Sequence, residues 1–127
     1  MELFQRDDWK KEKHVPVIEA PDTLKKGELT EVRVVVGKEI SHPNTTDHHI
    51  RWISLMFQPD GEKFPHHIGR AEFNSHGESV KGADTSTVYT DPVAVFSFRT
   101  EKSGKLIAVS QCNIHGFWEN TKDIKVE

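Results

Sequence analysis

The sequence has 127 residues, of which 35% are hydrophobic and 29% charged, and a formal net charge of −3 at pH 7. This composition is typical of one folded domain, here 1–127, and excludes a disordered or fibrous chain. The slight negative charge argues against a nucleic-acid partner. No apolar run approaches the roughly 20 residues that cross a bilayer, and the charged N-terminus does not resemble a signal peptide. We therefore expect a cytoplasmic protein with no membrane partner.

Period-two alternation, the pattern of a β-strand, is the strongest periodic signal along the chain. It is clearest in 29–36, where valines alternate with Glu31 and Arg33, whereas 1–16 shows no strand pattern. Further strands are expected, in chain order, at 49–57, 70–75, 86–90, 93–99, 105–111 and 122–126. Turns rich in Gly and Pro separate them, and no segment has helical periodicity. About seven short strands of this kind predict an all-β fold, an antiparallel β-sandwich, with a closed barrel as the alternative.

Eight histidines and a single cysteine direct attention to a metal site. One cysteine excludes an internal disulfide and a four-cysteine site. Cys112 and His115 are three residues apart just beyond a predicted strand, so that a thiolate and an imidazole can reach one ion. His42 and His48 flank a Pro-containing loop that can fold back and bring both rings to one point. Without a metal, the same residues are a buried free thiol and solvated loop histidines.

A third segment combines three different side chains next to one another. Glu12 supplies a carboxylate that can bind a hard oxidised metal ion, Lys13 an ammonium that can attract an anion, and His14 an imidazole. Imidazole together with thiolate suits iron or copper, and is less typical of structural zinc.

Two alternatives to an iron enzyme remain at this point. Cupredoxin electron carriers also use a β-sandwich, an upstream histidine and a late Cys-x-x-His, but they usually add a methionine a few residues later. Residues 117–127 contain no methionine. The other alternative is a structural metal site or histidine-rich binding domain with no redox role.

Three segments together resemble the signature of superoxide reductases: EKHVP, HPNTTDHHIRWI and CNIHGFWE. The sequence is similar to the short, one-iron members called neelaredoxins, and it lacks the N-terminal four-cysteine iron domain of desulfoferrodoxin. The resemblance implies an immunoglobulin-like sandwich of about seven strands. It also implies one-electron reduction of superoxide to hydrogen peroxide at a mononuclear non-haem iron, with no dioxygen produced.

The resemblance assigns roles to the residues of these segments. One iron ion, cycling between Fe²⁺ and Fe³⁺, is implied to have four imidazole ligands and one axial thiolate ligand. The implied ligands are His14, His42, His48, His115 and Cys112. Glu12 is implied to bind the ferric ion only, and Lys13 to lie beside the open sixth position. The resemblance further implies an external electron donor such as rubredoxin, and a homotetramer.

Four histidines match no ligand position: His49, His66, His67 and His76. His49 is expected to start a strand and therefore to point away from the histidine before it. We expect His66 and His67 to lie in a loop with a structural or solvated role. Trp52 and Trp118 are expected to belong to the core.

Overall fold

The computed structural model describes residues 2–127, which form nine strands and no helix. The strands are β1 (Phe4–Gln5), β2 (Pro16–Glu19), β3 (Thr23–Leu24), β4 (Thr30–Val36), β5 (Ile50–Pro59), β6 (His66–Glu72), β7 (Val93–Phe98), β8 (Gly104–Cys112) and β9 (Gly116–Val126). Seven of them have four or more residues, which agrees with the predicted all-β fold of about seven strands. No helix within 2–127 has the length and apolar character needed to cross a membrane.

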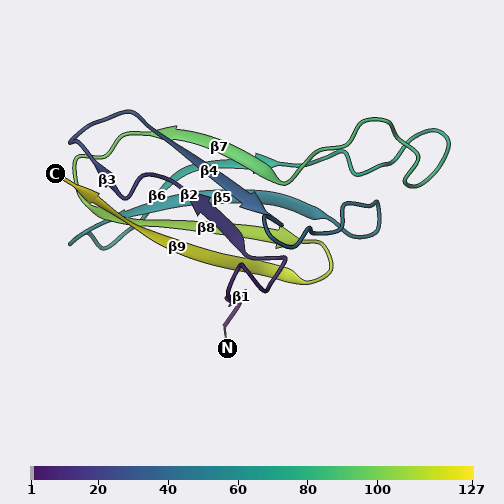
Figure 1. The fold of residues 1–127 in the computed structure, drawn as a ribbon, viewed down its shortest axis with the longest axis horizontal. Helices are drawn as coiled ribbons and strands as arrows, with labels where there is room; N and C mark the ends of the chain where they lie inside the picture. Colours follow the sequence, from purple (N-terminus) through teal and green to yellow (C-terminus); the bar gives the residue numbers. More distant parts are fainter. Residues whose placement is uncertain (1) are drawn as a thin grey trace.

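The strands form two sheets that lie face to face (Figure 1). The larger sheet has the order β1-β9-β8-β5-β6, with β3 also paired to β9, and the smaller has the order β2-β4-β7. The pairs between the longer strands are antiparallel, whereas the two-residue strands β1 and β3 pair with β9 in parallel. The antiparallel sandwich is confirmed, and two separate sheets exclude the closed barrel.

The core lies between the sheets and takes alternate residues from each strand. On β4 the side chains of Val32 and Val34 are fully buried, while Glu31 and Arg33 face solvent, as the alternation predicts. The larger sheet contributes Ile53, Leu55, Phe57, Leu106, Ala108 and Ile124. Burying an aliphatic side chain of this size stabilises the fold by about 1.5–3 kcal/mol. This core holds β5 and β8 rigidly side by side.

Several strand predictions differ from the structure, among them the absence of strands from 1–16, where β1 lies. Residues 86–90 form no strand and contribute only a single bridge between Tyr89 and His76. They have β-branched side chains, but Val88 and Tyr89 are 69% and 62% exposed, so no sheet face packs against them. The segment 74–92 instead projects from the sandwich (Figure 1). The strand predicted at 70–75 begins and ends earlier, as β6.

Strand β2 is absent from the prediction, because Pro16 carries no backbone donor. The structure tolerates Pro16 since β2 is an edge strand of the smaller sheet, where a proline removes no bond from the ladder. Its partner is β4, with Pro16 opposite Val36. The strand predicted at 122–126 is the second half of β9, which begins at Gly116.

Three connecting segments meet at one end of the sandwich (Figure 1). They are the β8–β9 turn, the loop 37–49 between β4 and β5, and the residues just before β2. In the ladder Cys112 lies opposite Ile50 on one side and Gly116 on the other. Gly116 has φ +79°, a conformation that glycine adopts without the steric cost of a side chain. This end therefore collects the three segments that the sequence singled out.

Candidate metal centre

The β8–β9 turn places a thiol and an imidazole next to each other. Cys112, the last residue of β8, is fully buried, whereas His115 is exposed in the turn. The backbone N–H of His115 donates to Cys112 Sγ at 3.4 Å, and His115 Nδ1 lies 3.7 Å from the same sulfur. His115 therefore directs Nδ1 toward the sulfur.

Contacts with Ser110 and Glu12 hold His14 at the same end of the sandwich. Its side chain is only 5% exposed. Its carbonyl accepts a hydrogen bond from the buried Ser110 Oγ at 3.1 Å, which ties the segment before β2 to β8. Its Nδ1 lies 2.5 Å from Glu12 Oε1, while its Nε2 lies 3.2 Å from His115 Nδ1. The Glu12 contact thus leaves Nε2 of His14 free to face the thiol.

The loop 37–49 contributes His42 and His48. His42 Nδ1 donates to the carbonyl of Pro43 at 2.6 Å, so its Nε2 carries the lone pair. His48 Nε2 lies 3.2 Å from His115 Nδ1. Both rings therefore turn Nε2 toward the same point, as the folding-back of this loop predicts.

Four imidazole rings stand around a common centre. In the order His14, His42, His48, His115 the neighbouring ring centroids are 4.8, 4.7, 5.0 and 4.8 Å apart, and the diagonal from His14 to His48 is 6.3 Å. Ligand atoms of His14, His42, His48 and Cys112 all lie within 4.8 Å of one another. His115 stands at the corner opposite His42. We call these five residues the His₄Cys cluster.

Burial keeps three of these imidazoles neutral. Desolvation lowers the pKa of His42 to about 4 and also lowers the pKa of His14 and of His48. The neighbouring imidazoles and the positive charge of Lys13 add to this effect in all three cases. A neutral imidazole has a free lone pair, which is the form that binds a metal ion.

The chemistry of the donor set fits a bound metal ion. His42 Nε2 is buried and has no hydrogen-bond partner within residues 2–127. Leaving a buried polar atom unpaired costs about 1–3 kcal/mol, and a metal ion at the centre of the ring would remove that cost. His14 and His42 each direct the other ring nitrogen at an oxygen, the usual arrangement of metal-binding histidines.

Glu12 and Lys13 lie beside the cluster without belonging to it. The Glu12 carboxylate accepts from the backbone N–H of His14 at 2.8 Å in addition to its contact with the ring. Burial raises the pKa of Glu12, but the bonds from His14 outweigh it and the net shift is downward. Lys13 is half-buried, and among residues 2–127 it forms no ion pair.

Sequence reasoning missed the tryptophan beside the cluster. Trp118 is half-buried and lies outside the core, stacked on His14 with ring centroids 4.9 Å apart at 14°. Its Nε1 donates to the carbonyl of His115 at 3.1 Å. Trp52 is also half-buried, with Arg70 4.0 Å above its ring. The expectation that both tryptophans belong to the core is wrong, because each covers one face of a polar side chain.

The histidines without a predicted ligand role are not among the candidate metal ligands. His49 precedes β5 rather than starting it, and its ring stacks on His76. His66 and His67 lie on strand β6, not in a loop, although both are solvent-exposed as expected. His66 is 3.6 Å from Glu62.

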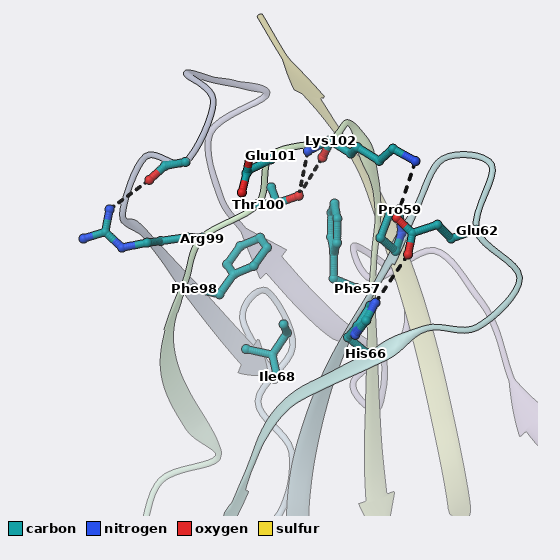
Figure 2. A pocket seen from close by; sticks show the side chains of 11 residues that line it. Phe57, Pro59, Glu62, His66, Ile68, Phe98, Arg99, Thr100, Glu101 and Lys102 are labelled. Carbon is teal, nitrogen blue, oxygen red and sulfur yellow. Dashed lines mark hydrogen bonds and ion pairs between the residues drawn. The ribbon is translucent and has the colours of Figure 1, made fainter.

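A pocket of about 550 Å³ lies between strands β5 and β6 and the residues 98–102 just before β8 (Figure 2). The cluster includes Cys112, at the other end of β8. The floor of the pocket includes the rings of Phe57 and Phe98. The charged groups at its rim pair with each other, with Glu62 3.6 Å from His66 and 3.5 Å from Lys102. None of the cluster residues lines it. The His₄Cys cluster is therefore the stronger candidate site.

Comparison with known proteins gives consistent matches over nearly the whole chain. The family model described as Desulfoferrodoxin matches residues 6–121. The superoxide reductase of Pyrococcus furiosus is 60% identical over 119 residues, which are 94% of each chain. The neelaredoxin of Megalodesulfovibrio gigas is 47% identical over 126 residues, 99% of this chain and 97% of that one. The solved superoxide reductase (neelaredoxin) of Archaeoglobus fulgidus in the reduced form superposes with a TM-score of 0.91 at 64% identity, covering 98% of this chain and 99% of that one.

Proposed function

The chain belongs to the superoxide reductases of the desulfoferrodoxin family, and from that premise we propose that it reduces superoxide to hydrogen peroxide at a mononuclear non-haem iron. One superoxide, one electron from an external donor and two protons from solvent give one hydrogen peroxide, with no dioxygen produced. The observation that carries this proposal is the ring of four imidazoles beside the Cys112 thiol.

The proposed iron ligands are the five residues of the His₄Cys cluster. The ligand atoms would be Nε2 of His14, His42 and His48, Nδ1 of His115, and Sγ of Cys112, which face the centre of the cluster. An iron ion held there would transfer one electron to superoxide and take one back from the donor. Four imidazoles and one thiolate suit iron, since together they offer both borderline and soft donors.

The burial of the cluster residues determines how superoxide enters. Cys112 is fully buried, and His14 and His42 are 5% and 9% exposed, so these residues close the cluster on the protein side. His115 is exposed, which leaves access for a small anion from solvent. The half-buried Lys13 supplies positive charge near this entrance, although the chain as a whole is negative.

Replacing Lys13 with alanine is expected to slow the bimolecular reaction with superoxide by about threefold or more at low ionic strength, because local charge steers an anion toward the site. The dependence of the rate on salt should weaken at the same time, since the steering charge is lost. Pulse radiolysis at several salt concentrations measures both effects. Lys105→Ala, the same charge change at the other end of β8, is the control. Equal rates for Lys13→Ala and the unmodified chain would exclude steering by this residue.

Replacing Glu12 with glutamine is expected to change the optical spectrum of the oxidised protein and to leave the reaction of the reduced protein with superoxide nearly unchanged. We propose that the Glu12 carboxylate leaves His14 and binds the ferric ion, which an uncharged amide does poorly. The amide oxygen of glutamine can still accept the hydrogen bond from the backbone N–H of His14, so the backbone of His14 stays in place. Titration with an oxidant, followed optically, measures the change. An oxidised spectrum identical to that of the unmodified chain would rule out the ligand role of Glu12.

Iron analysis combined with superoxide kinetics tests the proposed function. We expect about one iron per chain, a thiolate charge-transfer band on oxidation, and consumption of superoxide by the reduced protein without dioxygen evolution at an oxygen electrode. Full occupancy by copper or zinc after growth with iron available would contradict the proposal. Evolution of dioxygen would indicate a dismutase instead.

We also propose, on family resemblance, that a rubredoxin-like protein supplies the electron and that the chain forms a homotetramer. A donor is required because each turnover consumes one electron, and the one group of three or more candidate metal ligands within residues 2–127, His14, His42, His48 and Cys112, belongs to the proposed iron site itself. Stopped-flow oxidation of a reduced rubredoxin by the oxidised protein tests the donor, and light scattering tests the tetramer.

A further inference from the structure

The loop 37–49 carries two residues of the His₄Cys cluster but has little structure of its own. It contains no strand, and among the described residues its one internal backbone hydrogen bond runs from Thr45 N to His48 O at 2.9 Å. Side-chain hydrogen bonds also join Thr45 to His48 and His49, and His42 to Pro43. None of these bonds joins His42 to the turn 45–49, so the relative placement of His42 and His48 depends on what holds the loop from outside.

Asn44, between these two histidines in the sequence, uses both ends of its side chain. Its Nδ2 donates to the carbonyl of Thr90 at 2.6 Å, and its Oδ1 lies 3.1 Å from His76 Nδ1. Both partners belong to the segment 74–92, which projects from the sandwich (Figure 1). Asn44 thus fastens the loop to a segment that contains none of the cluster residues.

His76 contacts the loop at a second point. It is 6% exposed, and its Nε2 lies 2.6 Å from the carbonyl of Phe73, which fixes the ring plane. Its ring stacks on His49 with centroids 3.5 Å apart and planes within 5°. His76 therefore supports the loop on both sides of His48, at Asn44 and at His49.

We propose that His76 and Asn44, which we call the brace, are positioning residues that set the distance and orientation of His42 and His48 in the cluster. The inference rests on the metal centre proposed above. Neither residue belongs to the group of candidate ligands, so the brace acts only through the loop. His76 is buried, its Nε2 lies 2.6 Å from the carbonyl of Phe73, and His49 covers one face of its ring. The ring therefore has little freedom and is a rigid support.

Other contacts keep the loop folded without the brace. Thr46 N donates to Asp84 Oδ1 at 2.8 Å, and His49 N donates to Asn113 Oδ1 at 2.9 Å. Asn113 Nδ2 also donates to the carbonyl of Asp47 at 2.9 Å. Removal of the brace should therefore change the geometry of the metal site more than it changes the fold.

Cobalt(II) binding to the metal-stripped full chain tests the brace without any measurement of activity. Asn44→Ala removes both of its side-chain bonds, and His76→Phe keeps an aromatic ring against His49 while removing the bonds from its nitrogens. We expect each variant to weaken Co²⁺ binding by about 10–100-fold, the usual range for residues that orient metal ligands. The thiolate-to-cobalt band should shift. The double variant should be little worse than either single one, because the two residues act as a unit.

Ser54→Ala is the matched control. Ser54 is buried on β5, and its replacement removes the hydrogen bond that its hydroxyl accepts from Arg70 at 3.1 Å, outside the brace. The control variant should bind Co²⁺ with the unmodified dissociation constant and spectrum. A folded Asn44→Ala variant with the Co²⁺ affinity and spectrum of the unmodified chain would overturn the inference. This test remains available if His76→Phe does not fold. Asn44 is only half-buried, so the fold tolerates its replacement more easily than that of the buried His76. If the unmodified chain binds no Co²⁺, the proposed metal centre fails and the brace fails with it.

Discussion

Replacing Cys112 with serine is expected to abolish the thiolate charge-transfer band of the oxidised protein and nearly all of its reactivity with superoxide. The serine hydroxyl has a far higher pKa than a thiol and is a poor ligand for iron at neutral pH. Substituting residues that only orient ligands weakens metal binding by about 10–100-fold, so the loss of a proposed ligand should exceed that. Iron content, the optical spectrum and superoxide kinetics measure the three effects.

The fold of Cys112→Ser needs a separate check, because the cysteine is fully buried and belongs to the hydrophobic core. Far-UV circular dichroism and thermal unfolding of the metal-free variant provide it. His66→Ala is the matched control, since this exposed histidine pairs with Glu62 away from the cluster and should keep both iron and activity. A folded Cys112→Ser that retained the charge-transfer band would show that the sulfur is not a ligand.

The parts of the fold that followed from the sequence are those governed by alternation. Strand β4 matches its prediction almost residue for residue, because one of its faces is buried and the other solvated. A strand with both faces buried, or with both exposed, does not show this alternation of hydrophobic and polar residues. Residues 86–90 have strand-like side chains but form only a single bridge. Strand β2 depends on an edge position for Pro16 that only the sheet order reveals.

The candidate site followed from the sequence because its residues are clustered in short motifs. The spacing of Cys112 and His115 and the loop between His42 and His48 each predicted convergence, and the structure brings these side chains together with His14. The residues that support the ligands were not predictable in this way. Asn44 and His76 are 32 positions apart, and nothing in either segment alone indicates that they meet.

The metal-free protein is expected to lose stability as the pH falls from about 6.5 to about 4. Burial lowers the pKa of His42 to about 4, and it lowers the pKa of His14 and His48 in the same direction. In this window the unfolded chain binds more protons than the folded one, so acidification favours unfolding. A shift from 6.5 to about 4 corresponds to about 3 kcal/mol from His42 alone. Urea unfolding at several pH values, with a chelator present, measures the slope.

His42→Gln separates this effect from the general titration of carboxylates. The variant lacks the imidazole, so its free energy of unfolding should fall less steeply between pH 6.5 and 4, while the exposed His66→Gln should behave like the unmodified chain. A free energy independent of pH across this range would show that the buried imidazoles do not titrate as their surroundings require. Metal ions and protons compete for the same ring nitrogens. Release of bound metal on acidification should therefore begin in the same pH range. Protonation of the buried imidazoles would then explain both the loss of metal and the loss of stability.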